Sequence, residues 1–215
     1  MIDLNLIGIG TGNPEHVTIQ AIRALNTVDV VFVLDKGGEK ADLVALRREI
    51  CERYIEERPY RIVEAQDPER DRNPADYGVA VEDWHSARAA LYEAMIEREL
   101  QEDETGAFLV WGDPSLYDST LRIADRLRAG GMAMTITVVP GITSLQALTA
   151  AHAIPLNDVA APVLITTGRR LREAGWPDGV DTLAVMLDGG CAFDTLAPAG
   201  VTIWWGAYLG MAYEE

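Results

Sequence analysis

The sequence has little cysteine, histidine and lysine, and it has no long apolar run. Its two cysteines, Cys51 and Cys191, lie far apart and form neither a disulfide framework nor a metal-binding motif. The three histidines are scattered without metal-ligand spacing, so we expect no metal site. No apolar run approaches the roughly 18 residues of a membrane span, and no signal peptide is evident. We therefore expect a cytoplasmic protein with no membrane partner.

Basic residues are also scarce, and the formal net charge is −16 at pH 7. Binding to nucleic acid needs a basic face, so we expect no nucleic-acid partner. The lysines are limited to Lys36 and Lys40, which lie in one short stretch. An arginine-rich composition explains this shortage; alternatively, that stretch needs a flexible ammonium group.

The stretch around which the chain is organised joins an apolar run, Phe108 to Trp111, to the turn signal Gly112-Asp113-Pro114. Apolar residues at helical spacing follow over residues 119–127. This pattern predicts a strand, a tight turn and a helix. In an open α/β sheet, ligands bind outside the carboxyl ends of the strands, so such a turn would place a carboxylate beside a ligand. An ordinary turn has the same composition.

Five predicted strands alternate with helices along the first part of the chain, which indicates a mostly parallel α/β sheet. Thr18 can cap the first helix. A long polar loop at 67–77 is typical of a lid or binding loop. The expected strands are 3–9, 28–34, 60–64, 108–111 and 134–139, and the expected helices are 19–26, 42–54, 81–101, 119–127 and 145–152.

A domain boundary is expected near Pro155, which gives an N-terminal lobe at 1–155 and a smaller C-terminal α/β lobe at 156–215. The second lobe is predicted to contain a strand and turn over 163–170 and strands at 182–187 and 201–206. Roughly sixty residues form only a small hydrophobic core, so we expect this lobe to be stabilised by packing against the first lobe or a partner.

A dinucleotide-binding fold is the main alternative for the first turn. Gly8, Gly10 and Gly12 follow the first strand, and Asp35 closes the second, where a ribose-binding acid would lie. The next position is Asn13 rather than glycine, and the helix begins several residues later. The helix N-terminus is therefore not placed over a pyrophosphate.

Three turns at strand ends, at 8–13, 112–117 and 140–144, together resemble the tetrapyrrole (corrin/porphyrin) methylase family. That family has a glycine-rich turn followed by an acidic residue or Asn and by Pro, then Gly-Asp-Pro-x-x-Tyr/Phe in mid-chain, then Pro-Gly-x-Thr/Ser-Ser/Ala. All three motifs are present here in order, and the resemblance covers nearly the whole chain. It implies a two-lobed fold with a cleft between the lobes, S-adenosylmethionine as methyl donor, and a homodimer.

Further stretches, at 32–37, 43–51, 165–171 and 205–210, look like one branch of this family in cobalamin synthesis. That resemblance implies methylation of precorrin-5 at C-1, with loss of the acetyl fragment as acetate. Chains of that branch continue well past this length, so the C-terminal lobe is expected to be shortened. Other branches, such as uroporphyrinogen methylation or diphthine synthesis, and a non-catalytic S-adenosylmethionine-binding relative, remain alternatives.

The matching motifs indicate which residues of this chain correspond to the functional residues of the family. Methyl transfer from a sulfonium needs orientation, exclusion of water and removal of a proton, but no protein nucleophile. The resemblance implies Asp35 as a general base, with Lys36 beside it. The cofactor-binding residues are expected to be Thr11, Trp111, Gly112, Asp113, Leu116, Thr143, Ser144, Met186, Gly206 and Ala207, and the substrate-binding residues Gly10, Gly12, Tyr117, Arg169 and Arg170.

Each polar candidate also has a structural interpretation. Asp35 could cap the element that follows it, and Met186 could simply fill a core. Arg169 and Arg170 could lie on a solvated turn. Because the tetrapyrrole is a polyanion and the protein is acidic, long-range steering would be unfavourable. Binding would then depend on local cations, for which Lys36, Lys40, Arg169 and Arg170 are the candidates.

Overall fold

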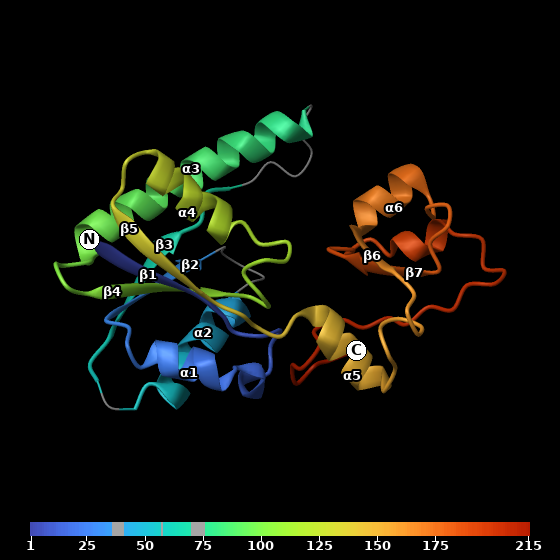
Figure 1. The fold of residues 1–215 in the computed structure, drawn as a ribbon, viewed down its shortest axis with the longest axis horizontal. Helices are drawn as coiled ribbons and strands as arrows, with labels where there is room; N and C mark the ends of the chain where they lie inside the picture. The colour runs from blue at the N-terminus through green and yellow to red at the C-terminus, as the bar shows by residue number, and fades with distance from the viewer. Residues whose placement is uncertain (36–40, 57, 70–75) are drawn as a thin grey trace. The chain divides into compact units, whose positions relative to one another are not determined.

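The computed structural model describes residues 1–35, 41–56, 58–69 and 76–215. The chain forms two compact units, Met1–Thr143 and Ser144–Glu215 (Figure 1). The sequence placed the boundary after residue 155, whereas helix α5 (Ser144–His152) belongs to the second unit. The reason is local packing, because Nε2 of His152 lies 2.9 Å from the backbone oxygen of Trp205.

The first unit contains a five-stranded sheet with the order β3-β2-β4-β1-β5, and all its pairings are parallel. This confirms the predicted α/β fold. The central strands β1, β2 and β4 are buried on both faces, as their near-continuous apolar runs predict, whereas the edge strands β3 and β5 are partly exposed. Their bounds are β1 Ile2–Gly8, β2 Val30–Asp35, β3 Arg61–Gln66, β4 Thr105–Val110 and β5 Met134–Val139.

Helices cover both faces of this sheet (Figure 1). Helices α1 (Ile19–Leu25) and α2 (Ala41–Tyr54) form one apolar core with one face. Helices α3 (Tyr77–Glu99) and α4 (Thr120–Ala129) form a second core with the other face. In that second core Phe108 of β4 stacks on Tyr92 of α3, with ring centroids 4.1 Å apart.

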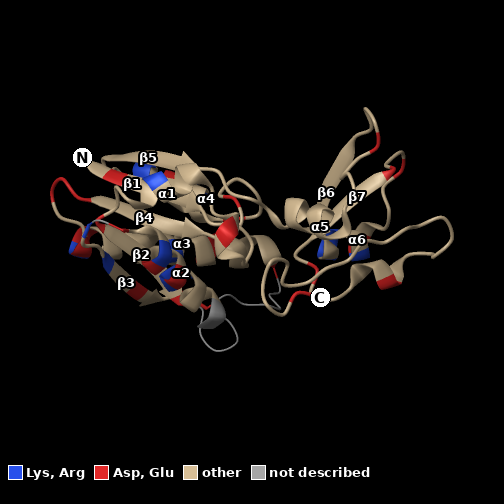
Figure 2. Ribbon diagram, turned by 90° about the horizontal axis from the view of Figure 1, so that it is seen from below, with Lys and Arg blue, Asp and Glu red and all other residues tan. Residues whose placement is uncertain are grey.

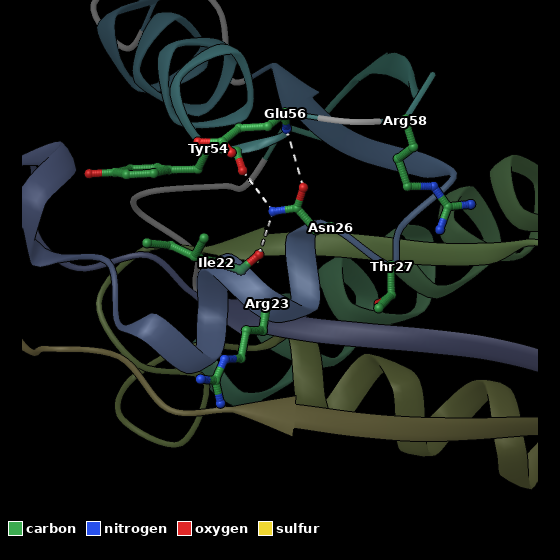
Figure 3. A pocket seen from close by; sticks show the side chains of 7 residues that line it. All are labelled: Ile22, Arg23, Asn26, Thr27, Tyr54, Glu56 and Arg58. Atoms are coloured by element: carbon green, nitrogen blue, oxygen red, sulfur yellow. Dashed lines mark hydrogen bonds between the residues drawn. The ribbon is translucent and has the colours of Figure 1, made fainter.

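Hydrogen-bonded caps fix where the helices begin. The hydroxyl of Thr18 accepts a hydrogen bond from the N–H of Ala21 at 3.0 Å, which confirms the predicted cap of α1. At the other end of α1, the amide of Asn26 donates to the backbone oxygens of Ile22 and Tyr54 and accepts from the N–H of Glu56 (Figure 3). Asn26 thus joins the C-terminal ends of α1 and α2.

This joint lies in a surface pocket that also contains Arg23, Thr27 and Arg58 (Figure 3). The pocket lies beside the segments that lead into β2 and β3, at their amino ends. Ligands in parallel α/β sheets bind at the opposite, carboxyl ends. The polar atoms of Asn26 are engaged with backbone groups, so we interpret this pocket as a structural joint.

The second unit contains a two-stranded parallel sheet, β6 (Val163–Thr167) and β7 (Thr182–Met186). Helix α6 (Gly168–Ala174) and a short 3-10 helix, η3 (Ala192–Thr195), complete its regular structure. The predicted turn at 168–170 is wrong, because α6 begins at Gly168, where the hydroxyl of Thr167 caps it by accepting from the N–H of Arg170.

The predicted strand at 201–206 is also wrong, because these residues pair with no strand in the described part of the chain. Their apolar side chains suggested a buried strand, yet Ile203, Trp204 and Trp205 are about half exposed. The segment is held instead through His152, whose ring centroid lies 5.2 Å from that of Trp204. An apolar run alone does not provide the partner edge that a strand needs.

Candidate functional site

The carboxyl ends of β1 and β4 are joined by their own turns. Gly10 and Gly112 form an isolated antiparallel bridge, in which the N–H of Gly112 donates to the oxygen of Gly10 at 2.7 Å and the reverse bond measures 3.3 Å. Both residues have positive φ, 80° and 67°, which glycine adopts readily. The bridge holds the two predicted ligand-binding turns together and uses the backbone polar groups of Gly10.

The turn after β5 packs closely against the turns after β1 and β4. A Cβ on Gly141 would lie 2.0 Å from the backbone oxygen of Gly112, and one on Gly8 would lie 2.6 Å from the nitrogen of Gly141. Three strand ends therefore meet backbone to backbone at Gly8, Gly112 and Gly141. Glycine is required at positions 8 and 141 because a side chain at either would separate the turns, and at position 112 because of the positive φ.

Asp113 ties two of these turns through its carboxylate. One oxygen accepts from the N–H of Gly141 at 2.8 Å, and the other accepts from the N–H of Ser115 at 2.8 Å and from the Ser115 hydroxyl. Burial alone would raise the pKa of Asp113, but the hydrogen bonds from Ser115 and Gly141 outweigh it and lower the pKa. The carboxylate is thus ionised and positions the turn.

Two buried polar atoms in the first turn have no hydrogen-bond partner among the described residues. They are the hydroxyl oxygen of Thr11, whose residue is 3% exposed, and Nδ1 of His16. Buried polar atoms are nearly always paired, so a polar ligand atom would satisfy them. Motif matching pointed to Thr11 but missed His16. The signal available for His16 was its position in the same turn.

The remaining first-unit candidates lie on the same turns. Trp111 is partly buried against the α1–α2 core, and Leu116 is partly buried on the turn after β4. Tyr117 is 44% exposed with a φ of 50°, an uncommon value for a bulky residue. Gly12 is buried and Thr143 is partly buried. The structure therefore gathers Gly10, Thr11, Gly12, Trp111, Gly112, Asp113, Leu116, Tyr117 and Thr143 on the turns after β1, β4 and β5.

Asp35 is the last residue of β2 and is partly buried. Its backbone oxygen accepts from the N–H of Asp67 at 2.8 Å and from the side-chain amide of Gln66 at 3.0 Å. The residue thus lies at the carboxyl edge of the sheet, as predicted. Lys36 and Lys40 fall outside the described residues.

The other predicted residues belong to the second unit. Ser144 begins α5, and Met186 ends β7, where it pairs with Thr167. Ala207 exchanges backbone hydrogen bonds with Glu215 at 2.8 and 3.0 Å. Gly206 packs so closely that a Cβ there would lie 2.8 Å from a side-chain carbon of Leu209. Arg169 and Arg170 are exposed on α6, and Nε of Arg169 lies 3.9 Å from the Glu173 carboxylate.

Charge on the first unit is mixed, and Figure 2 shows acidic and basic positions interspersed over its helices and strands. One arginine, Arg47 of α2, is partly buried, whereas Arg48 and Glu49 beside it are exposed. Its Nε donates to the backbone oxygen of Leu109 in β4 at 3.0 Å. Sequence reasoning missed this residue, although it occupies the inward stripe of α2 at helical spacing from Leu43 and Ile50.

Neither a metal centre nor a membrane span is found in the part of the chain that the structure describes. No group of three or more His, Cys, Asp or Glu residues there could hold a metal ion. No described helix has both the length and the apolar character needed to cross a bilayer.

A doubly covered parallel sheet whose strand ends meet in three glycine turns defines a class of ligand-binding α/β protein. The chain belongs to the tetrapyrrole (corrin/porphyrin) methylase family, whose model matches residues 3–214. It is 53% identical over 210 residues to the precorrin-6A synthase [deacetylating] of Sinorhizobium sp, covering 97% of this chain and 80% of that protein. The resemblance found in the sequence is confirmed.

Solved structures support the same family. A cobalamin synthesis related protein (CobF) from Corynebacterium diphtheriae shares 38% identity and superposes with a TM-score of 0.79, covering 100% of this chain and 84% of that one. Uroporphyrin-III-C-methyltransferase from Thermus thermophilus shares the fold at 22% identity, with a TM-score of 0.57 over 99% of this chain and 80% of that one. S-adenosylmethionine is the methyl donor of the family and the cofactor of this protein.

Proposed function

We propose that the protein transfers a methyl group from S-adenosylmethionine to C-1 of precorrin-5 and releases the acetyl fragment as acetate, giving precorrin-6A. The observation that carries this proposal is the 53% identity to a precorrin-6A synthase over 97% of the chain. A methylase acting elsewhere on the corrin ring, such as the precorrin-2 C(20)-methyltransferase of Sinorhizobium sp, is only 29% identical. The step at C-1 is therefore favoured over the other branches.

The turns of the first unit are proposed to bind the cofactor. When bound, S-adenosylmethionine supplies an electrophilic methyl group. The buried Thr11 hydroxyl, which has no partner among the described residues, offers a polar contact to this ligand. The Gly10–Gly112 bridge and the Asp113–Gly141 hydrogen bond hold the turns in place before binding, which reduces the ordering cost. Trp111, Leu116, Thr143, Ser144, Met186, Gly206 and Ala207 complete the proposed contacts.

Asp35 is proposed as the general base and Lys36 as its catalytic neighbour. The position of Asp35 at the carboxyl end of β2 supports this role, because that edge carries the other candidate residues of the first unit. Gly10, Gly12, Tyr117, Arg169 and Arg170 are proposed to contact the tetrapyrrole. The exposure of Arg169 and Arg170 on α6 leaves both accessible to carboxylate side chains.

A homodimer in the cytoplasm is proposed as the working form. Both cysteines are free, which suits a reducing compartment. Exposed aromatic residues such as Trp204 and Tyr208 in the second unit would suit a subunit interface. Light scattering at several concentrations measures the mass in solution, and a monomer at every concentration would exclude the dimer.

The reaction is tested by incubating the full chain with precorrin-5 and S-adenosylmethionine. Mass spectrometry should show a product that has gained a methyl group and lost the acetyl group, with S-adenosylhomocysteine and acetate formed alongside. Parallel incubations with precorrin-2 and uroporphyrinogen III test the other branches. Turnover of either compound in place of precorrin-5 would reassign the substrate, and cofactor binding without any turnover would indicate a non-catalytic relative.

The catalytic proposal for Asp35 has its own test. Asp35→Asn should lower kcat by about 10²–10⁴-fold, the usual contribution of general acid–base catalysis, while S-adenosylhomocysteine binds as before. Asp125→Asn on the exposed face of α4 is the matched control, since Asp125 lies 3.9 Å from Arg128 and has a side chain 70% exposed. If Asp35→Asn behaved like this control, Asp35 would not be the base.

A further inference from the structure

Arg47 lies where two neighbouring strands part. The register of β2 and β4 ends at Phe32 and Phe108, so Leu109 lies beyond the last residue pair of these two strands. The carbonyl of the following residue, Val110, faces the other way and accepts from the N–H of Ile9, the residue after β1, at 3.0 Å. Nε of Arg47 donates to the Leu109 oxygen at 3.0 Å.

A second bond fixes the guanidinium. Nη1 of Arg47 donates to the backbone oxygen of Leu43, one turn earlier in α2, at 2.8 Å. An arginine has five N–H donors, so its two bonds to described residues leave three that no other described residue uses. The residue remains partly exposed. The head group is therefore held in place at the carboxyl edge of the sheet by two hydrogen bonds to backbone oxygens.

No carboxylate among the described residues forms a direct ion pair with Arg47. The buried Arg88, by contrast, has its Nε 2.7 Å from the Asp67 carboxylate. Asp118 attracts Arg47 from a longer distance, but its Oδ1 accepts from the N–H of Thr120. Burial lowers the pKa of Arg47, as expected for a cation short of compensating charge.

We propose that Arg47 is an anion-recognition residue that binds a carboxylate of the bound ligand. A fixed, partly desolvated guanidinium is suited to carboxylates, and the reaction brings two sources of this group. One is the set of acetate and propionate side chains of the tetrapyrrole, and the other is the amino-acid carboxylate of the cofactor. The identity of these ligands rests on the proposed function; the anion site itself does not.

The test uses two substitutions on the same helix. Arg47→Gln and Arg48→Gln remove the same charge, but Arg48 is exposed and pairs with Glu64 at 2.7 Å, so it serves as the matched control. Binding of uroporphyrin III, a stable tetrapyrrole polycarboxylate, is followed by fluorescence at two salt concentrations. Binding of S-adenosylhomocysteine is followed by calorimetry. Both are measured well below each variant's melting temperature.

We expect Arg47→Gln to weaken uroporphyrin III about ten- to hundredfold and to reduce the salt dependence of its binding, relative to Arg48→Gln. A comparable loss for S-adenosylhomocysteine alone would assign the carboxylate to the cofactor. If both affinities matched those of Arg48→Gln, the proposal would be wrong.

Arg47→Lys keeps the positive charge but loses the planar guanidinium group. This variant replaces Arg47→Gln if the glutamine variant does not fold. It should bind with intermediate affinity, and wild-type affinity for both ligands would contradict the proposal. These measurements need no turnover. If the wild-type protein bound both ligands but left precorrin-5 unchanged, the proposed reaction would be refuted, and the proposal for Arg47 would not be affected.

Discussion

The carboxylate of Asp113 and the backbone N–H of Gly141 are joined by a hydrogen bond of 2.8 Å that ties the turn after β4 to the turn after β5. The second carboxylate oxygen is held by Ser115. Asp113→Asn would place an amide NH2 group against one of these N–H donors. We expect the free energy of unfolding to fall by about 1–3 kcal/mol, measured by urea denaturation.

Ser115→Ala is the control for this substitution, because it removes only the hydroxyl and leaves the backbone bonds to Asp113 in place. It should cost less than Asp113→Asn. The dissociation constant of S-adenosylhomocysteine is measured on the same preparations. Unaltered stability together with weaker binding would show that the carboxylate contacts the ligand instead of positioning the turns.

Gly141→Ala should damage the first unit more than any cap substitution. Its Cβ would lie 2.0 Å from the Gly112 oxygen and 2.9 Å from Cα of Gly8, and these are backbone atoms that cannot rotate away. We expect a loss of at least about 1–3 kcal/mol, typical of overpacking, with weakened S-adenosylhomocysteine binding. Gly189→Ala makes the same chemical change where no atom lies within 4 Å, and it should be nearly neutral in a melting experiment.

The two cysteines should differ in reactivity. Cys51 is fully buried, and burial, followed by the nearby Glu52, raises the pKa of its thiol to about 12. Cys191 is partly exposed. At pH 8 a disulfide reagent should modify Cys191 readily and Cys51 only after denaturation, because the thiolate is the reactive form. Rapid modification of Cys51 in folded Cys191→Ser protein would contradict this.

His85 should make stability depend on pH. Its Nε2 lies 3.0 Å from the Ser119 hydroxyl, at the start of α4. Burial, and then the positive charge of Arg126, lower the pKa of His85 below its ordinary value of about 6.5. The unfolded chain therefore binds the proton more readily than the folded one.

The contribution of His85 to stability should accordingly be complete above about pH 6.5 and should decrease as the pH falls below it. Urea unfolding between pH 5 and pH 8 measures this. His85→Gln should flatten the part of the curve below pH 6.5, since the remaining slope comes from carboxylates. An identical slope in wild type and variant would mean that His85 does not titrate differently on folding.

Much of the first unit was predictable because its signals are local. Thr18 is followed by apolar residues at helical spacing, and its hydroxyl caps α1 as expected. The run before Gly112 becomes β4, with both faces buried. Turn composition and order identified the family. The second unit was less predictable, because the segment at 201–206 has strand-like side chains but no partner edge.

The site was predictable only where a motif marked it. Gly112 and Asp113 belong to such a motif. Arg47 lies in a helix without a motif, and it became a candidate only because it bonds to β4 where the pairing of β2 and β4 ends. The close approach of Gly8 to Gly141 likewise joins turns that are far apart in the sequence. Long-range pairing of this kind leaves no periodic signal in a single sequence.

Strand β1 has a consequence for synthesis on the ribosome. It precedes both of its neighbours in the chain, because it pairs with β4 and β5, where Asp3 stands opposite Thr105 and Ile2 opposite Met134. Such long sequence separations slow folding and leave apolar surface exposed in the meantime. A nascent chain must therefore carry the apolar side chains of β1, such as Leu4 and Leu6, without a strand partner until β4 has emerged, and one edge of β1 stays unpaired until β5 follows.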